Sequence, residues 1–359
     1  MKIDQFICDI DYVSCNLGIF LCKECAVIHR SVGVHISLVK PLSSKSWHLS
    51  ELNFLEKVGN MAARENYQKH LPLSYRRPTS LDPLVVREQW VRAKYEREEF
   101  SQPNRGSYRL GHKEGLLWKK DKHKATYKSR KFMLSGVDNC LMYFTKNPKK
   151  PKGKLNLFEL NVTFCPAKME NPNGMQIVFY QKGEVRCIFV YAEEGQDAAN
   201  EATVQEIVSW YNAIRAAKLN AQLVAFPHET EAHLAAQVTW DFANEGWLQK
   251  SGPSASDPYR RRWFTMDRRH LMYFENPLDP TPRGMIFVGH RFDGFSVRRG
   301  VPPGYVQLPF GFTLITPNRR YLLFADNNEE LARWFNVLDF VVETEPGPLD
   351  LPLSSRRSS

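Results

Sequence analysis

KEGLLWKKDKHKATYKSRKFMLSGVDNCLMYF, from Lys113 to Phe144, is matched about 130 residues later by NEGWLQKSGPSASDPYRRRWFTMDRRHLMYF, from Asn244 to Phe274. The residues that keep step are Gly115 with Gly246, Lys119 with Lys250, Arg130 with Arg262, Phe132 with Phe264, and Tyr143-Phe144 with Tyr273-Phe274. This spacing is that of a domain, whereas solenoid repeats are much shorter. The sequence therefore predicts one binding module that occurs twice.

Each copy begins with short aromatic and β-branched runs broken by turn residues, and it ends with one amphipathic helix. Apolar residues recur at helical spacing in both closing helices, at Val204, Ile207, Tyr211 and Ile214 in the first and at Leu331, Trp334 and Leu338 in the second. Asn327 or Asn328 is expected to cap the second helix. Strands followed by a helix predict α+β modules.

The segment before the repeats is helical in pattern up to about Phe100, and the stretch SQPNRGSYR that follows has the Pro and Gly of a linker. The expected parts are an N-terminal domain over 1–100, a linker over 101–109, the first module over 110–220, a second linker over 221–239, the second module over 240–343 and a disordered tail over 344–359. The fold class is thus α+β and multidomain.

A formal net charge of +10 favours anionic partners, either nucleic acid or a phospholipid surface. No apolar run approaches the roughly 20 residues needed to span a bilayer, and the start MKIDQFICDID lacks the apolar stretch of a signal peptide. Seven scattered cysteines favour a reducing compartment over a disulfide framework. These features predict a globular, cytoplasmic protein that visits membranes.

Positive charge is concentrated in the first copy. From residue 112 to 131, eight Lys and Arg stand against two acidic residues, a net charge of +6. Because side chains alternate faces along a strand, Lys128 and Arg130 should point the same way, and Lys119 on the paired strand can join them. A planar guanidinium beside two ammonium groups suits adjacent phosphates on a small rigid ring, and Tyr143 could add a hydroxyl donor. The alternative is a solvated basic face.

This pattern resembles pleckstrin homology (PH) domains that bind polyphosphoinositides through K-xn-(K/R)-x-R between their first two strands. The matching residues are Lys119, Lys128 and Arg130 with Tyr143 in the first copy, and Lys250, Arg260 and Arg262 with Tyr273 in the second. Trp210 and Trp334 match the tryptophan of the closing helix. The resemblance implies two seven-stranded β-sandwiches, each capped by a C-terminal helix, with 3-phosphorylated inositol lipids and soluble inositol polyphosphates as ligands. The loop 251–257 has no Lys, so the second site lacks the extra cations of the first.

CKEC, at Cys22 and Cys25, is half of a possible zinc site, because two thiolates at this spacing can share one tetrahedral metal. The run NLGIFLCKECAVIHRSVGVHIS, from Asn16 to Ser37, resembles the Arf GTPase-activating protein (ArfGAP) domain, in which a second CxxC leads into IHR-x-x-G-x-H-x-S. Gly59-Asn60 and the helix over 87–100 agree with that family. The order ArfGAP, PH, PH resembles the ArfGAP group with dual PH domains. It implies a helical, zinc-finger-type domain, bound Zn²⁺ and an Arf-family GTPase as partner.

Arg30 falls at the arginine finger of that family. The resemblance implies that Arg30 places a fixed positive charge against the phosphoryl group while GTP is cleaved on the partner. Taken without the family, an arginine in a helical segment is a surface charge. The resemblance to the family implies that the chain regulates GTP hydrolysis on Arf and has no substrate turnover of its own.

One part of the family pattern is missing. The family has a first CxxC that would fall near Lys2 to Gln5, and no cysteine stands there. Cys8 and Cys15 have the wrong spacing, so we expect an N-terminally truncated or alternatively started zinc finger. Because structural zinc often supplies the folding energy of a small domain, Arg30 would be poorly held and activation weak or absent.

Two functions follow from these features. The first is a GTPase-activating protein for Arf, recruited from the cytoplasm to the plasma membrane by PH domains that bind phosphatidylinositol 3,4,5-trisphosphate. The second is a catalytically inactive, phosphoinositide-binding adaptor. The missing CxxC favours the adaptor, whereas the IHR run and Gly59-Asn60 favour the activator. Nucleic acid is not expected as a partner, because no recognition-helix or single-strand motif is present.

Overall fold

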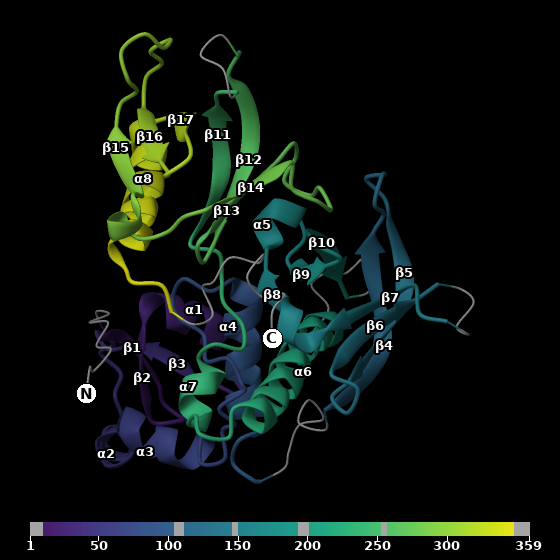
Figure 1. Cartoon of the computed structure of the whole chain (residues 1–359). Helices are drawn as coiled ribbons and strands as arrows, with labels where there is room; N and C mark the ends of the chain where they lie inside the picture. The colour runs from purple at the N-terminus through teal and green to yellow at the C-terminus, as the bar shows by residue number, and fades with distance from the viewer. Residues whose placement is uncertain (1–9, 104–110, 146–149, 193–200, 253–256, 348–359) are drawn as a thin grey trace.

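The computed structural model describes residues 10–103, 111–145, 150–192, 201–252 and 257–347, which form three domains in contact (Figure 1). The expected first linker lies outside these residues from position 104 onward, and the expected disordered tail lies outside them from position 348 onward. No helix in the described ranges combines the length and the apolar character that crossing a membrane requires.

Within residues 10–103, short helices surround a three-stranded antiparallel sheet of order β2-β1-β3. The elements are β1 (Ile10–Ser14), β2 (Ile19–Cys22), α1 (Lys23–Ser31), β3 (Val39–Pro41), α2 (Leu49–Lys57), α3 (Gly59–Tyr67), α4 (Leu84–Val91) and a π-helical turn (Arg92–Glu96). The sequence pattern indicated the helices and not the sheet. Strands of three to five residues are too short for alternation to separate them from loops.

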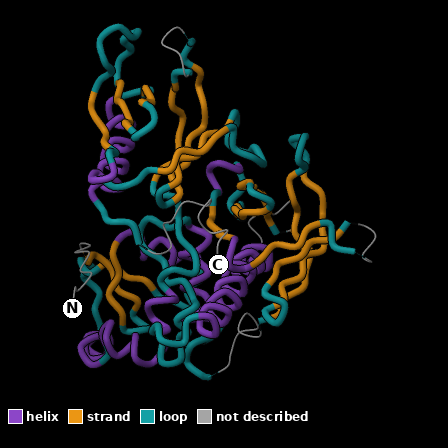
Figure 2. Tube along the Cα trace, viewed as in Figure 1, coloured by secondary structure: helices purple, strands orange, loops and turns teal. Residues whose placement is uncertain are grey.

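Each repeated module has seven antiparallel strands and a C-terminal helix, which confirms the α+β prediction (Figure 2). The strand orders match, β7-β6-β5-β4-β10-β9-β8 in the first and β14-β13-β12-β11-β17-β16-β15 in the second. The first module contains β4 (His112–Lys120), β5 (Tyr127–Ser135), β6 (Cys140–Phe144), β7 (Gly153–Asn156), β8 (Leu160–Phe164), α5 (Pro166–Met169), β9 (Met175–Gln181), β10 (Glu184–Tyr191) and α6 (Glu201–Ala225). The second contains β11 (Asn244–Lys250), β12 (Arg260–Asp267), β13 (His270–Phe274), β14 (Gly284–Phe287), β15 (Ser296–Arg299), β16 (Gly311–Ile315), β17 (Arg320–Phe324) and α8 (Asn328–Glu343).

The closing helices differ in length. Helix α6 continues to Ala225, and α7 (Glu231–Ala235) follows it before the second module begins. Helix α8 is capped by Asn327, whose side-chain oxygen accepts the N–H of Glu330 at 2.9 Å. Of the two candidate caps, the structure therefore selects Asn327.

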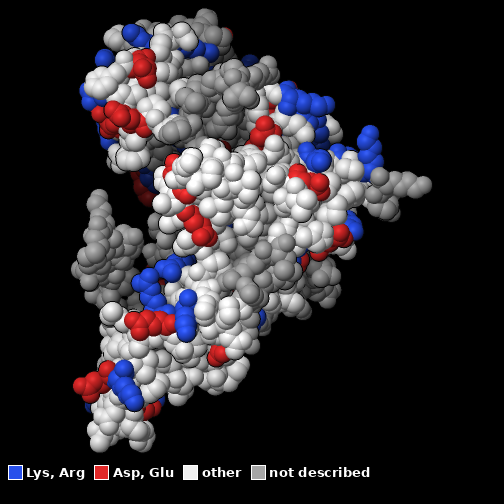
Figure 3. All heavy atoms as spheres, turned by 60° about the horizontal axis from the view of Figure 1, so that its bottom comes forward, with Lys and Arg blue, Asp and Glu red and all other residues white. Residues whose placement is uncertain are grey.

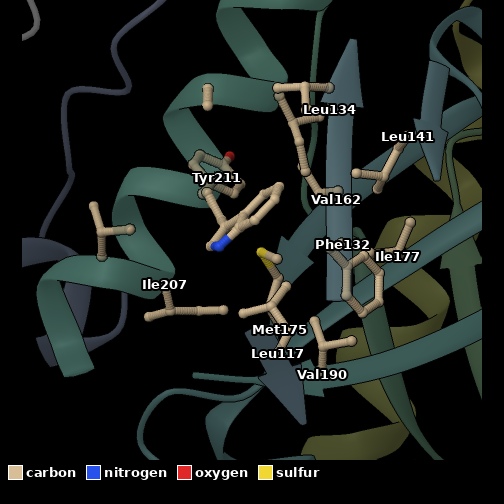
Figure 4. Close-up of a cluster of buried hydrophobic side chains, with 14 of the residues drawn as sticks. Leu117, Phe132, Leu134, Leu141, Val162, Met175, Ile177, Val190, Ile207 and Tyr211 are labelled. Carbon is tan, nitrogen blue, oxygen red and sulfur yellow. The ribbon is translucent and has the colours of Figure 1, made fainter. Parts of the chain in front are cut away.

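The repeated aromatic residues form the same contacts in both cores. Trp210 on α6 is fully buried and meets Phe132 of β5 edge-on, with ring centroids 6.3 Å apart. In Figure 4, Phe132 lies among the apolar side chains of the strands, and Tyr211 of α6 faces them. Trp334 and Phe264 repeat the arrangement at 6.2 Å. Burial of these large rings anchors each helix on its strands.

Buried contacts join the three domains. Tyr75 and Phe100 of the N-terminal domain belong to the same apolar cluster as the core of the first module. A second cluster combines residues of both modules, including Cys165, Cys187 and Phe189 from the first and Met272 and Phe274 from the second. Arg76 links all three domains, because its guanidinium donates to Tyr211 Oη at 2.9 Å and to Asp241 Oδ1 at 3.1 Å. The second module is therefore held in place against the first.

Candidate anion-binding sites and the candidate catalytic arginine

The register of β4 and β5 gathers the predicted cations at one end of the first module. Lys119 lies opposite Lys128, and Arg130, two residues further along β5, lies opposite Leu117. Leu117 and Phe132, on the same face, are fully buried. This face of the sheet therefore passes from apolar core residues to cations where the module opens.

A cavity of about 460 Å³ lies at this end, and it is lined by Lys119, Lys128, Arg130 and Tyr143. Lys119 Nζ is 5.3 Å from the centroid of the Tyr143 ring. Burial, followed by the charges of Lys152 and Arg130, lowers the pKa of Lys119 to about 8. A partly desolvated ammonium group among like charges is stabilised by a multivalent anion, so the cavity is suited to a phosphorylated ligand.

Other cations in this cavity were not singled out in the sequence. Lys152 and Arg186 line it, and Asp121 is the one carboxylate among its described lining residues. Arg186 Nε is buried and has no hydrogen-bond partner in the described part of the chain. The lysine-rich run around Pro151 could have drawn attention to Lys152, whereas Arg186 on β10 has no local signal. Figure 3 shows Lys and Arg gathered at the upper right of its visible face, on the side where Figure 1 places β4 and β5.

The second module repeats the register of the first. Lys250 lies opposite Arg260, and Arg262 lies opposite the buried Leu248. The three cations and Tyr273 line a cavity of about 600 Å³. Lys250 Nζ is 5.0 Å from the centroid of the Tyr273 ring, as Lys119 is beside Tyr143. The structure therefore brings the predicted residues of each copy together.

The second cavity is less positive than the first. Two carboxylates, Asp257 and Glu275, are among its lining residues, together with Arg283. Arg283 Nε donates to a Glu275 carboxylate oxygen at 3.1 Å, so this additional cation is already paired. A cavity with more acidic groups attracts an anion less strongly. Neither Glu275 nor Arg283 belongs to the K-xn-(K/R)-x-R pattern of Lys250, Arg260 and Arg262.

Each candidate tyrosine packs across a glycine of the neighbouring strand. Tyr143 lies opposite Gly153, and Tyr273 lies opposite Gly284. A Cβ atom on Gly153 would lie 2.2 Å from Tyr143 Cε1, and one on Gly284 would lie 2.1 Å from Tyr273 Oη. The glycines thus leave the space that the rings occupy. The sequence does carry this signal, because a glycine follows each tyrosine by ten or eleven residues.

Arg30 lies in the last turn of α1 and is exposed. Its guanidinium is 4.8 Å from the centroid of the Tyr12 ring on β1, a cation–π distance. The helix ends at Ser31, and the Gly33 N–H donates to the Arg30 carbonyl at 3.2 Å. The side chain therefore presents a positive charge that a partner could approach.

A buried polar network fixes the chain on both sides of Arg30. His29 Nδ1 lies 2.9 Å from Ser37 Oγ, which donates to Ser14 Oγ at 2.8 Å. Ser14 Oγ in turn donates to Asn16 Oδ1 at 3.0 Å. Burial, and then the charge of Lys94, lowers the pKa of His29 to about 4, so the ring is neutral at physiological pH. Within the IHR-x-x-G-x-H-x-S run, His29 and Ser37 thus have a structural role.

Asn60 joins α3 to the N-terminal sheet. Its side-chain oxygen accepts the Phe20 N–H at 2.7 Å, and its side-chain nitrogen donates to the Phe20 carbonyl at 3.1 Å. Gly59 before it has a φ of +63°, which glycine adopts without the steric cost of a side chain. The Gly59-Asn60 pair therefore holds the framework that carries α1.

Cys22 and Cys25 lie at the start of α1. Cys22 is the N-cap, and its Sγ accepts the Cys25 N–H at 3.5 Å. The described residues contain no group of three or more His, Cys, Asp or Glu side chains that could hold a metal ion. A structural zinc site uses four ligands, so these two thiolates do not make a complete Zn²⁺ site within the part of the chain that the structure describes.

We expect the purified chain to retain well under one zinc per molecule after dialysis against EDTA, because two thiolates do not close a tetrahedral site. Plasma mass spectrometry on protein of known concentration measures this ratio. Cys22→Ser is the control, and it should give the same value. One zinc retained by the wild type and lost in Cys22→Ser would contradict the expectation.

Matches to known proteins agree with this arrangement. The family described as putative GTPase activating protein for Arf matches residues 8–104, and the PH domain family matches residues 111–218 and 243–343. Arf-GAP with dual PH domain-containing protein 2 from Rattus norvegicus is 35% identical over 355 residues, which cover 98% of this chain and 92% of the relative. The protein of the same name from Homo sapiens is also 35% identical, with 98% and 91% covered.

A further relative matches the N-terminal domain by itself. Stromal membrane-associated protein 1 from Homo sapiens is 39% identical over 93 residues, 26% of this chain and 19% of that protein. The matches over nearly the full length, together with one ArfGAP and two PH domains in order, show the family. The chain belongs to the Arf-GAPs with dual PH domains.

Proposed function

We propose that this protein activates GTP hydrolysis on an Arf-family GTPase at the plasma membrane, to which phosphatidylinositol 3,4,5-trisphosphate recruits it from the cytoplasm. The first cavity supports this proposal most directly. Seven Lys and Arg and a single carboxylate are among its described lining residues. Lys119, Lys128 and Arg130 bind the phosphates of the headgroup, and soluble inositol polyphosphates compete for the same groups.

The second PH domain binds the same class of headgroup more weakly, through Lys250, Arg260 and Arg262. Strands β4 and β11 both end on the same side of the molecule, upward in Figure 1. One membrane surface can then engage both cavities, which raises the effective concentration of the second site once the first is occupied. The hydroxyls of Tyr143 and Tyr273 donate hydrogen bonds to the bound phosphates.

In the ArfGAP domain, Arg30 is the residue that we assign to catalysis. Its positive charge would lie against the phosphoryl group of GTP on the partner and stabilise the charge that develops there. Cys22 and Cys25 supply two thiolates for Zn²⁺, at the start of the helix that carries Arg30. The two-thiolate set is the observation that favours the second candidate function, a membrane adaptor without catalysis.

A single-turnover assay on vesicles tests the proposed function. Arf loaded with GTP is placed on vesicles with or without phosphatidylinositol 3,4,5-trisphosphate, and phosphate release is followed after the protein is added. We expect stimulation about tenfold greater on vesicles that carry the lipid, because binding concentrates the protein at the surface. Binding to these vesicles with hydrolysis at the intrinsic rate would identify the adaptor instead.

A further inference from the structure

A loop of the second PH domain borders the 460 Å³ cavity of the first. The loop joins β13 to β14 over residues 275–283. Leu278, Pro280 and Thr281, in its middle, line the 460 Å³ cavity together with the cations of the first PH domain. Its ends, Glu275 and Arg283, line the cavity of the second PH domain. One loop therefore borders both candidate anion sites.

The loop lies beside β10 of the first PH domain, where β10 and β4 do not pair. Strand β10 begins at Glu184, yet it pairs with β4 only at Val190 and Tyr191. The earlier part of β10 thus has an open edge on its β4 side. There the Cys187 N–H donates to the Pro280 carbonyl of the second PH domain at 2.8 Å. A backbone carbonyl of one PH domain thus forms a hydrogen bond with the open edge of the other.

Apolar contacts hold the loop in this position. Leu278 packs against the buried cluster that contains Cys187 and Phe189 of the first PH domain and Phe274 of the second. Lys168 of the first PH domain also forms an ion pair with Glu245 of the second, and the Lys168 side chain is 5% exposed. The loop is therefore fixed between the domains, and its Thr281 is only half-buried beside the cavity.

We propose that Leu278, Pro280 and Thr281 form the second wall of the headgroup site of the first PH domain, so that a phosphorylated inositol ring bound there contacts both PH domains. This inference rests on the proposed function of that cavity. The cations of the first PH domain neutralise the phosphates, and the Thr281 hydroxyl donates to one of them. Leu278 and Pro280 displace water from the opposite side, which strengthens the attraction between cations and phosphates.

Opposite charges placed at Thr281 test the wall in the full chain. An Arg262→Ala background disables the second site, and inositol 1,3,4,5-tetrakisphosphate is titrated by calorimetry. Thr281→Glu should weaken binding by at least about fivefold and Thr281→Lys should strengthen it by a similar factor, because each charge would face the phosphates at close range. Phe292→Glu and Phe292→Lys are the matched controls. Phe292 is 87% exposed and lines neither cavity, so these changes should have little effect.

The outcomes separate this inference from the proposed function. If Arg130→Ala abolishes binding while both Thr281 variants bind with the affinity of the Arg262→Ala background, the loop does not contact the ligand. The proposed headgroup site of the first PH domain would still be supported. If Arg130→Ala changes nothing, the proposed headgroup site itself is wrong. Sedimentation with vesicles that carry phosphatidylinositol 3,4,5-trisphosphate is the second arm. If the Thr281 variants change the affinity for both the soluble ligand and the vesicles, the loop contacts the lipid headgroup. If they change the affinity for the soluble ligand alone, the loop contacts free inositol phosphate. Because the two variants should act in opposite directions, a general loss of folding cannot imitate the result.

Discussion

Arg130→Ala should weaken binding of the full chain to vesicles that carry phosphatidylinositol 3,4,5-trisphosphate by about tenfold to a hundredfold. The change removes a charge-assisted and bidentate contact to phosphate, which typically contributes about 1.5–3 kcal/mol. The guanidinium lines the cavity, and within the part of the chain that the structure describes its one hydrogen bond goes to the adjacent Ser129 carbonyl, at 2.9 Å. It is thus available for the ligand. Sedimentation over a range of lipid concentrations measures the change.

Lys131→Ala is the matched control. It removes the same charge from the next residue of β5, but Lys131 does not line the cavity and pairs with Glu114, with 2.6 Å between Lys131 Nζ and a Glu114 oxygen. Binding by Lys131→Ala should stay close to that of the wild type. Arg130→Lys keeps the charge and loses the planar fork, so it should lie between the two. If Arg130→Ala sediments like the wild type, the proposed pocket is wrong.

The gathering of these cations could be anticipated because strand geometry is regular. With a side-chain period of two, Lys128 and Arg130 must share a face, and a short hairpin brings Lys119 opposite Lys128. The repeated pattern then predicted the same arrangement for Lys250 and Arg260. Local sequence is enough where the residues of a site belong to one hairpin.

Residues that enter a site from elsewhere in the fold could not be anticipated in this way. Arg186 reaches the first cavity from β10, whose position depends on the packing of the whole module. Thr281 comes from another domain, and its placement depends on contacts such as the Cys187 to Pro280 hydrogen bond. Neither the interface nor its register leaves a periodic pattern in the sequence.

In the N-terminal domain, too, local sequence pattern alone did not identify the candidate site residue or the contacts that hold it. Arg30 was found by the resemblance of its neighbours to a family, and the helical pattern could not distinguish it from a surface charge. The structure explains those neighbours, since His29 and Ser37 form a buried network and Asn60 binds the Phe20 backbone. Such contacts join residues 8 and 40 positions apart, and only the folded chain shows them.

Arg30→Ala should remove whatever stimulation of GTP hydrolysis the protein gives. A well-placed arginine finger contributes roughly 10³- to 10⁵-fold in rate, so its loss leaves the intrinsic rate of the partner. We expect the wild-type stimulation itself to be weak. Helix α1 begins directly after Cys22, and an incomplete zinc site would leave the start of the helix that carries Arg30 without its metal anchor. Single-turnover hydrolysis by Arf-GTP on lipid vesicles measures both quantities.

Arg64→Ala is the control for this experiment, because Arg64 is an exposed arginine of the same domain on α3. It should leave the stimulation unchanged, whereas Arg30→Lys should lose most of it, since an ammonium group lacks the planar fork. Stimulation that survives in Arg30→Ala would contradict the arginine-finger assignment. Strong wild-type stimulation together with one bound zinc would contradict the expected weakness, and it would mean that ligands beyond Cys22 and Cys25 complete the site. The zinc measurement and the Arg30 variants therefore have to be made on the same preparation, because the first determines how the second is interpreted.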